Sequence, residues 1–118
     1  MPQQTSLGIS SEMQQCIDEC TRCHNICLAL VNHCLERGGK HADPAHIAML
    51  LDCAEICQTS ANFMLRSSER HHLTCRVCAE VCRVCADDCE RMAEGDEMMQ
   101  QCADQCRRCQ ESCERMAA

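Results

Sequence analysis

The stretch CRVCAEVCRVCADDC at Cys75–Cys89 determines the expected fold. Its cysteines recur every three or four residues, which is the spacing of one face of an α-helix and not the alternation of a β-strand. Cysteines at steps of three, four or seven residues recur in three other segments, as in the seam of a helix bundle. The sixteen cysteines are Cys16, Cys20, Cys23, Cys27, Cys34, Cys53, Cys57, Cys75, Cys78, Cys82, Cys85, Cys89, Cys102, Cys106, Cys109 and Cys113. The pattern predicts helices that each turn a cysteine stripe toward their neighbours.

Glycine and capping residues divide the chain into four helical segments. Two consecutive glycines, at positions 38 and 39, end the first segment. Asp43 and Pro44 give the second segment a capping residue and a proline at its first helical position. Gly95 and Asp96 separate the last two segments, and Ser67 or Ser68 is expected to cap the third. The sequence therefore predicts α-helices over residues 11–37, 44–66, 69–94 and 97–116.

Short connections between these segments favour antiparallel packing, which brings the four stripes together inside one bundle. We expect an all-α fold, an antiparallel four-helix bundle with a cysteine-lined core, over residues 11–118. Residues 1–10 are expected to form a flexible N-terminal segment. The last helix has little else to bury, because Leu, Ile, Val and aromatic residues are absent from Cys85 to Ala118. Its buried face is expected to consist of Cys, Met and Ala.

Charge and targeting signals narrow the class of protein. The formal net charge is −7 with no basic stripe, which argues against nucleic-acid binding. No apolar run approaches the roughly 20 residues of a membrane helix. The first residues lack the basic and apolar regions of a secretory signal, so we expect a cytoplasmic protein. Thiols are kept reduced in that compartment, and a dense cysteine pattern there indicates metal binding before disulfides.

The spacing and number of the thiols favour Cu(I). Cysteines four residues apart on a helix have Cβ atoms about 5–6 Å apart, which is too far for a disulfide but suits a soft ion held between two sulfurs. Thiolate ligands select Cu(I) by softness. About sixteen Cu⁺ ions would balance sixteen thiolates, whereas four Zn²⁺ ions in separate Cys₄ sites would leave half of that negative charge uncompensated. The sequence thus predicts several Cu(I) ions per chain.

The cysteine-rich stretches also resemble those of a known family. The resemblance is to the bacterial cytosolic copper storage proteins, and it covers about residues 11–118. Its most specific parts are CIDECTRCHNIC at Cys16–Cys27, CAEIC at Cys53–Cys57, CRVCAEVCRVCADDC at Cys75–Cys89 and CADQCRRCQESCERMAA at the C-terminus. This resemblance implies a homotetramer, Cu(I) held along the core by CxxxC pairs and cross-helix thiolates, and no catalytic turnover. A protein that stores copper is also expected to have a copper chaperone as a partner.

Methionine and histidine extend the stripes at the ends of the bundle. Members of that family often carry histidines where the third helix ends and the fourth begins, whereas this chain has Met92, Met98 and Met99 there. The antiparallel arrangement places His46, which occupies a stripe position, at the same end. We therefore predict a copper entrance formed by His46, Met92, Met98 and Met99. Two further histidines at this end are expected to be solvated: His33 and His41.

Three alternative functions fit part of the pattern. A structural or interaction bundle would be as stable without metal as with it. A zinc or cadmium thiolate buffer would use the same ligands, although the charge count above disfavours it. A thiol-redox protein would need an exposed cysteine whose pKa is lowered by a helix N-terminus or a cation. Only a few arginines lie next to cysteines in the sequence, and one redox pair would leave fourteen cysteines without a role.

Overall fold

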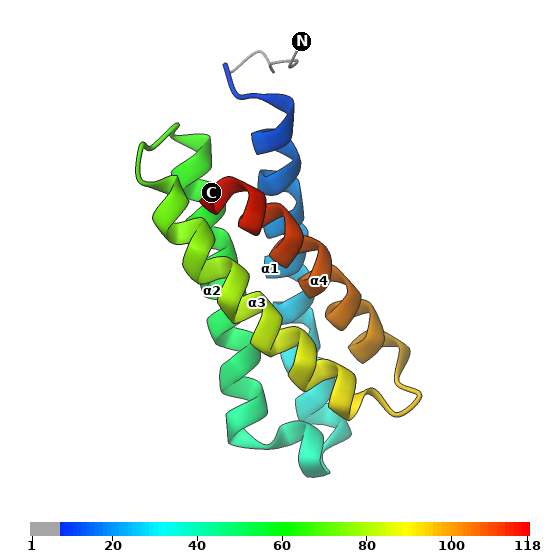
Figure 1. The fold of residues 1–118 in the computed structure, drawn as a ribbon. Coiled ribbons are helices and arrows are strands. Elements are labelled where there is room, and N and C mark those ends of the chain that lie inside the picture. Colours follow the sequence, from blue (N-terminus) through cyan, green and yellow to red (C-terminus); the bar gives the residue numbers. More distant parts are fainter. Residues whose placement is uncertain (1–7) are drawn as a thin grey trace.

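The computed structural model describes residues 8–118 and folds them into four α-helices and one short 3-10 helix (Figure 1). The elements are α1 (Ser11–Arg37), η1 (Gly39–Ala42), α2 (Pro44–Leu65), α3 (His71–Ala93) and α4 (Glu97–Ala117). Each α-helix packs against two neighbours, in the pairs α1–α2, α2–α3, α3–α4 and α1–α4. Successive helices run in opposite directions, which confirms the predicted antiparallel four-helix bundle.

The two ends of the bundle differ in what they contain. The η1 end comprises the end of α1, η1, the start of α2 and the connection from α3 to α4 (Figure 1). The opposite end holds the start of α1, the connection from α2 to α3 and the end of α4. The molecule measures 49 × 22 × 21 Å, so a central row of ligands along its long axis can connect these two ends.

Three helices begin at residues that supply side-chain caps, and Asp43 is the one that the sequence predicted. Ser10 Oγ accepts a hydrogen bond from the Met13 amide, and an Asp43 carboxylate oxygen accepts one from the amide of Ala45. Asp96 caps α4 by accepting a hydrogen bond from the amide of Met99 at 3.1 Å. These bonds satisfy amides that have no partner within the helix, and they fix where each helix starts.

The start of α3 differs from the prediction. The helix begins at His71, two residues later than expected, and its N-cap residue Arg70 makes no side-chain cap. Ser68 Oγ accepts a hydrogen bond from the Arg70 amide, so this serine closes a turn before the helix and does not cap it. Ser67 has a φ of 55°, which is the left-handed conformation that ends α2. The predicted serine cap is therefore wrong.

The N-terminal segment predicted at residues 1–10 falls mostly outside the described residues, because the structure describes the chain from Gly8. Within the described part, Ile9 is buried and joins the core cluster. The hydrophobic core thus begins two residues before α1.

Cysteine forms the centre of the core. All sixteen cysteine side chains are buried, and each has a relative exposure of 1% or less. Free cysteine packs as a small hydrophobic residue, so the bundle can close around it without large aliphatic layers. The buried face of α4 departs from the expected Cys, Met and Ala, since it also includes Gln105 and Ser112. Gln105 is accommodated because its amide nitrogen donates to the main-chain oxygen of Glu19 at 3.1 Å.

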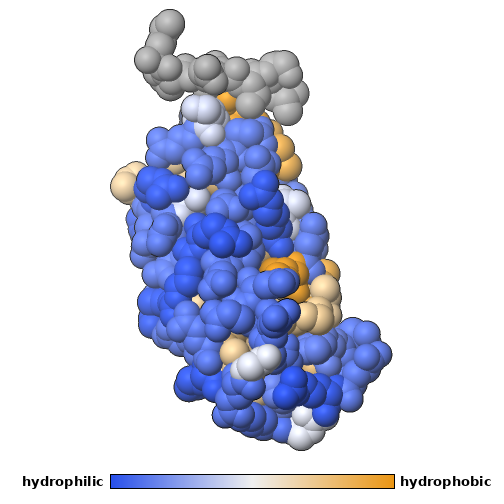
Figure 2. All heavy atoms as spheres, turned by 90° about the vertical axis from the view of Figure 1, so that its right-hand side faces the viewer, coloured by the Kyte–Doolittle hydropathy of each residue, from blue (hydrophilic) through white to orange (hydrophobic). Residues whose placement is uncertain are grey.

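The outer surface is mostly polar. Figure 2 shows one face on which hydrophilic residues predominate and only small apolar areas interrupt them. Among the described residues, no helix combines the length and the hydropathy needed to cross a membrane.

Candidate metal centre

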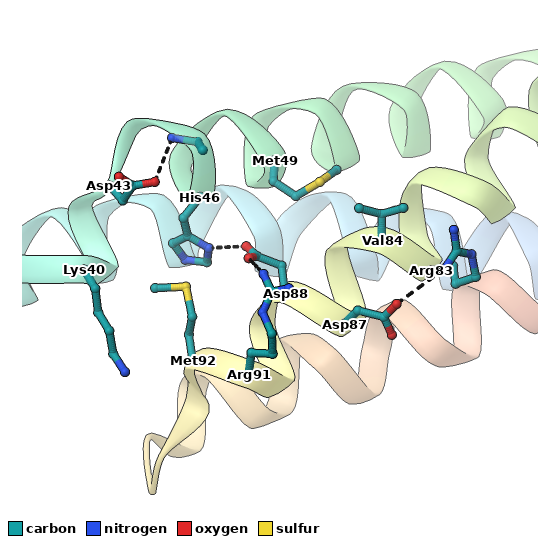
Figure 3. Close-up of a pocket in the computed structure, with 11 residues that line it drawn as sticks. Lys40, Asp43, His46, Met49, Arg83, Val84, Asp87, Asp88, Arg91 and Met92 are labelled. Carbon is teal, nitrogen blue, oxygen red and sulfur yellow. Dashed lines mark hydrogen bonds and ion pairs between the residues drawn. The ribbon is translucent and has the colours of Figure 1, made fainter.

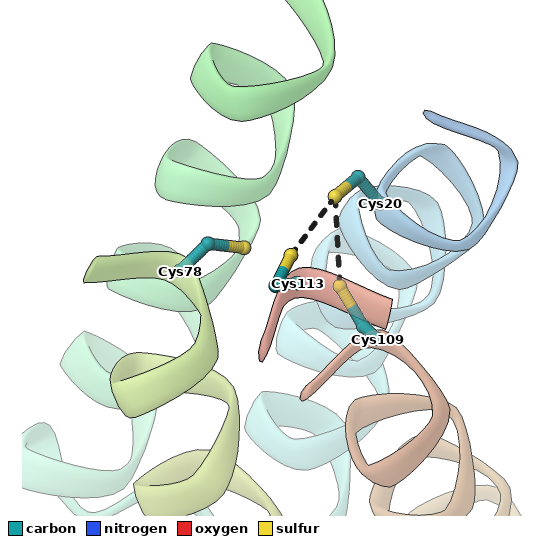
Figure 4. Close-up of side chains that lie close together, drawn as sticks. All are labelled: Cys20, Cys78, Cys109 and Cys113. Carbon is teal, nitrogen blue, oxygen red and sulfur yellow. Dashed lines mark hydrogen bonds between the residues drawn. The ribbon is translucent and has the colours of Figure 1, made fainter. Parts of the chain in front are cut away.

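The thiols converge on the bundle axis from all four helices. Figure 4 shows one such group, in which Cys20 of α1, Cys78 of α3, and Cys109 and Cys113 of α4 point toward one another. The Sγ atom of Cys20 lies 3.6 Å from that of Cys113 and 3.7 Å from that of Cys109. All four Sγ atoms lie within 4.8 Å of one another. Four sulfur atoms at this separation can surround one soft metal ion after small side-chain adjustments.

Groups of this kind form a continuous row. Among the described residues, five sets of three or four cysteines bring their Sγ atoms within 4.8 Å of one another, and each set shares at least one cysteine with the next. In order along the bundle the sets are Cys16/Cys75/Cys113, Cys20/Cys78/Cys109/Cys113, Cys57/Cys78/Cys82/Cys109, Cys23/Cys53/Cys57/Cys82 and Cys23/Cys27/Cys53/Cys106. A shared cysteine can bridge two metal ions. The arrangement is therefore suited to a connected metal–thiolate row more than to separate sites.

The row continues toward the η1 end. Cys27 Sγ lies 3.8 Å from Cys102 Sγ, which adds a cysteine of α4 beyond the last complete set. Cys85 and Cys89 of α3 are fully buried in the same part of the core. The four cysteines outside the sets thus extend them: Cys34, Cys85, Cys89 and Cys102.

Most of the close thiol contacts join different helices. Of the seven CxxxC pairs, Cys78 and Cys82 alone have Sγ atoms in hydrogen-bond contact, at 3.8 Å, within the described residues. The contacts of Cys57 illustrate the cross-helix pattern, since its Sγ lies 3.6 Å from Cys78 of α3 and 3.8 Å from Cys109 of α4. All sixteen cysteines are free thiols. Sequence spacing identifies the pairs on each helix, but the cross-helix partners depend on how the helices are rotated.

Burial and neighbouring thiols perturb the acidity of the core. Burial raises the pKa of Cys34 to about 11, and the nearby Asp96 carboxylate adds to this effect. Hydrogen bonds from Cys106 and Cys27 lower the pKa of Cys102 to about 6. Hydrogen bonds to neighbouring cysteines, together with burial, raise the pKa of several others: Cys27, Cys57, Cys106 and Cys113. A metal ion that binds these thiols as thiolates must therefore displace protons.

The η1 end of the row carries three candidate metal ligands of different chemical types. Cys34 Sγ lies 3.3 Å from His46 Nε2 and 3.5 Å from Met99 Sδ. All three residues are buried, and they come from α1, α2 and α4. The other ring nitrogen of His46, Nδ1, lies 2.5 Å from Asp88 Oδ2 of α3. Thiolate, thioether and imidazole are all ligands that Cu(I) accepts.

A surface pocket leads to this group from solvent. It is lined by Lys40, Asp43, Ala45, His46, Met49, Arg83, Val84, Asp87, Asp88, Arg91 and Met92 (Figure 3). His46 is nearly buried and contacts Cys34 on its inner side, so it separates the pocket from the core. In Figure 3 the thioether of Met92 points toward the ring of His46.

The four residues predicted at the entrance occupy three different environments. His46 and Met92 line the pocket, and Met99 lies on the core side, fully buried next to Cys34. Met98 is 39% exposed on the surface and does not line the pocket. The structure therefore brings three of the predicted residues together around the end of the row and leaves Met98 outside.

The histidines expected to be solvated are more enclosed than predicted. His41 is buried, which contradicts the prediction, because η1 folds it against the bundle. Its Nδ1 atom has no hydrogen-bond partner among the described residues. His33 is partly buried and pairs with Asp96, with 2.8 Å between Nε2 and Oδ2. Gly38 caps η1 and Gly39 begins it, and this glycine pair does not indicate that the following histidine turns inward.

Asp96 links several parts of this end, although sequence reasoning treated it only as part of a helix break. Besides capping α4, its Oδ2 atom lies 2.7 Å from Arg37 Nη1. Burial acts to raise the pKa of Asp96, but hydrogen bonds from His33 and the Met99 amide lower it to about 2. Asp96 thus ties the end of α1, which carries Cys34, to the start of α4, which carries Met99.

Comparison with known proteins identifies the same architecture elsewhere. A family described as copper storage protein matches residues 9–118. A crystal structure of the Nmul_A1745 protein from Nitrosospira multiformis is 48% identical, with a TM-score of 0.84, and the match covers 90% of this chain and 94% of that one. No protein with a curated description matches the chain.

Two further similar structures contain copper. The Cu(I)-bound copper storage protein BsCsp3 of Bacillus subtilis is 30% identical, with a TM-score of 0.84 and coverage of 92% of this chain and 100% of that one. A cytosolic copper storage protein from Streptomyces lividans, with five coppers, is 30% identical, with a TM-score of 0.78 and coverage of 90% and 92%.

Proposed function

Because this chain belongs to the copper storage protein family, we propose that it binds and stores many Cu(I) ions on the thiolates of its core. The observation that supports this most directly is the continuous row of cysteine sets that share ligands. A row of bridging thiolates holds more ions than separate sites with the same number of ligands. Cu(I) is the cargo, and the role is binding and release without catalytic turnover.

The proposed ligands are the sixteen cysteines of the row. Each is buried, and the core around them excludes water, so charge must be balanced inside it. A monovalent ion can balance each thiolate individually, and two or three sulfurs satisfy its coordination. Zn²⁺ prefers four ligands in a closed tetrahedron, so four zinc ions in separate Cys₄ sites would leave half of the thiolate charge unbalanced in the core. Charge balance therefore favours Cu(I) over a zinc or cadmium buffer.

The burial of the thiols also weighs against a thiol-redox protein. A redox cysteine must reach its partner protein or substrate, and it therefore needs an accessible sulfur. Here every cysteine has a relative exposure of at most 1%. A metal ion can enter such a core by exchanging from one sulfur to the next, whereas a protein disulfide cannot.

We propose that copper is loaded at the η1 end. The surface pocket reaches His46, and His46 is in contact with Cys34, the outermost cysteine of the row at this end. Met92 in the pocket and Met99 in the core offer thioether ligands on either side of His46. A Cu(I) ion would pass from Met92 to His46, and from there to Cys34 and Met99. Met98 is the weakest of the predicted entrance residues because it is exposed and does not line the pocket.

Competition for copper tests the proposed function. The reduced protein is titrated anaerobically with Cu(I) in the presence of a Cu(I) chelator, and in parallel with Zn²⁺. We expect tight uptake of more than about ten Cu(I) per chain, against roughly four zinc ions or fewer. Uptake of only one or two Cu(I) would refute storage and redirect attention to thiol redox chemistry.

We propose that the protein acts in the cytoplasm as a homotetramer supplied by a copper chaperone. The Streptomyces lividans relative is described as cytosolic. Support for self-association comes from exposed apolar side chains on neighbouring helices, such as Leu28 and Leu35 of α1 and Leu51 of α2. Leu28 and Leu51 border the same surface groove. Sedimentation of the wild type and of L28K/L51K tests this surface, since a tetramer held elsewhere would persist in the variant.

A further inference from the structure

Asp88 forms a hydrogen bond with the imidazole at the inner end of the pocket. Its Oδ2 atom lies 2.5 Å from His46 Nδ1, and the side chains of His46 and Asp88 are 2% and 16% exposed. Its other oxygen, Oδ1, lies 2.5 Å from Arg91 Nη2, which holds the carboxylate in place. Figure 3 shows Asp88 between the other two side chains, joined to His46 on one side and to Arg91 on the other.

This contact determines which nitrogen of His46 is free. A carboxylate only accepts hydrogen bonds, so the ring proton of a neutral His46 must lie on Nδ1 when it bonds to Asp88. Nε2 then carries the lone pair, and it faces Cys34 Sγ at 3.3 Å. The opposite tautomer would place a proton between Nε2 and Cys34 and would remove the nitrogen ligand.

The same geometry is typical of histidines that bind metals. Such histidines usually donate their second ring N–H to a carboxylate or carbonyl group, which fixes both the tautomer and the orientation of the ring. Asp88 satisfies this requirement from α3, while His46 belongs to α2 and the sulfur ligands belong to α1 and α4. Asp88 itself does not reach Cys34 or Met99 through any hydrogen bond in the structure, so its effect must pass through His46.

We propose that Asp88 is a positioning residue for copper uptake: it holds the His46 ring proton on Nδ1 and so presents Nε2 as the nitrogen ligand beside Cys34 and Met99. The inference rests on the proposed copper storage function and adds to it a residue that does not touch the ion. It also gives a role to a carboxylate that is only partly exposed and lies against a buried histidine.

Asp87 provides a matched control. It lines the same pocket one residue away, and it pairs with Arg83 and Arg107 on the surface. Replacing it removes the same charge from the same pocket without touching His46. The variants are therefore D88N, the conservative D88E, the control D87N, and H46A with and without D88N.

The first measurement needs no copper. Nitrogen-15 NMR of the histidine rings reports which ring nitrogen of His46 carries the proton. We expect the Nδ1–H form in the wild type and in D87N. In D88N the amide can donate to Nδ1 as well as accept from it, so the Nε2–H form should appear. An unchanged His46 tautomer in D88N would overturn the proposal.

The second measurement is the initial rate of Cu(I) uptake from a Cu(I)–bicinchoninate complex under anaerobic conditions. Loss of a partner that orients a metal ligand typically weakens metal binding about 10–100-fold, and we expect the rate in D88N to fall about tenfold. D87N should load within about twofold of the wild type, and D88E should recover most of the rate. In the H46A background, D88N should cause no further slowing.

Equal rates for D88N and D87N would contradict the proposal, as would a D88N effect that persists without His46. A D88N protein that fails to fold would leave D88E and the wild-type tautomer as the deciding observations. Total copper capacity is measured on the same samples. A capacity of one or two ions in the wild type would refute storage itself, whereas full capacity with unaffected rates would refute only the role of Asp88.

Discussion

Cys57 is the residue at which ligand sharing has its clearest consequence. Its Sγ atom lies 3.6 Å from Cys78, 3.7 Å from Cys82 and 3.8 Å from Cys109, and it belongs to two adjoining cysteine sets. The substitution C57S keeps the size of the side chain and a hydrogen-bonding group, while it replaces a soft ligand with a hydroxyl that Cu(I) does not favour. The change therefore removes one ligand from the middle of the row.

The expected loss of copper follows from the two sets. One missing thiolate leaves the core one negative charge short, so charge balance requires at least about one Cu(I) fewer per chain. Both adjoining sets lose a ligand, so about two ions fewer is the expected upper limit. C34S is the matched control, because Cys34 belongs to none of the all-cysteine sets and its loss should remove at most about one ion.

Native mass spectrometry of the anaerobically loaded proteins counts these ions directly. Circular dichroism checks the fold of the copper-free variant, which should lose only about 1 kcal/mol from the exchanged hydrogen bonds. An unchanged copper count in C57S would show that Cys57 is not a ligand. A loss of about half of the copper would show that the ions form one indivisible cluster, which would contradict a row of neighbouring sites.

Three further predictions concern acidity and stability. Copper affinity should fall as pH falls, by about tenfold per pH unit for each proton that a bound ion displaces. Chelator competition between pH 6 and 8 measures this. An affinity that does not depend on pH would show that the thiols are already ionised. In the copper-free protein, the pKa of Cys34 is raised from an ordinary 9.0 to about 11, so its contribution to stability is complete below pH 9 and is lost as pH rises toward 11. C34S removes this thiol and should therefore lose less thermal stability than the wild type between pH 9 and 11. An identical alkaline profile in the two proteins would contradict this. D96A removes the cap of α4 and the contacts with His33 and Arg37, so it should lower the free energy of unfolding by about 1–3 kcal/mol at pH 7. Because the pKa of Asp96 is lowered to about 2, its contribution to stability is present above its ordinary pKa of 3.8 and is lost as pH falls through 2. The difference in unfolding free energy between D96A and the wild type, measured by urea denaturation, should therefore shrink in this range. A difference that stays constant with pH would refute this role of Asp96.

Copper should also stabilise α4 more than the other helices. Met99 is the only large apolar side chain among the buried residues of α4, so packing holds this helix weakly in the copper-free protein. Cu(I) at a free concentration of 100 times its dissociation constant adds about 2.7 kcal/mol, which should slow amide exchange in α4 about 100-fold. Hydrogen exchange with and without copper measures this. Equal protection of α4 in both states would mean that the metal does not hold it.

The fold could be predicted from the sequence because cysteine spacing and helix breakers act locally. Steps of three and four residues define a helix face in any context, and residues such as Pro44 and Gly95 lie at the helix ends that they predicted. The start of α3 could not be predicted as well, because Ser68 forms a turn with Arg70 that competes with capping. A serine that closes a turn and a serine that caps a helix cannot be told apart from the sequence.

The candidate site was predictable in composition but not in its connections. The spacing placed all sixteen cysteines on inward faces, and all are buried. Which sulfurs meet across helices depends on helix rotation and stagger, which no single segment encodes. The same limit explains why the pairing of Asp88 with His46 could not be predicted: Asp88 lies next to Cys89 in the sequence and reads as a surface carboxylate, yet its partner is on another helix. Likewise, His41 turns inward through η1, and a glycine pair indicates only that a turn occurs there.

A crystal structure of the fully loaded protein, with copper located by anomalous scattering, would show how the ions are arranged along the core. We expect a continuous row of copper ions along the bundle axis, from the set of Cys16, Cys75 and Cys113 to the group of Cys34, His46 and Met99, with shared cysteines bridging neighbouring ions. Copper confined to isolated sites that share no cysteine, or bound only on the surface, would contradict it.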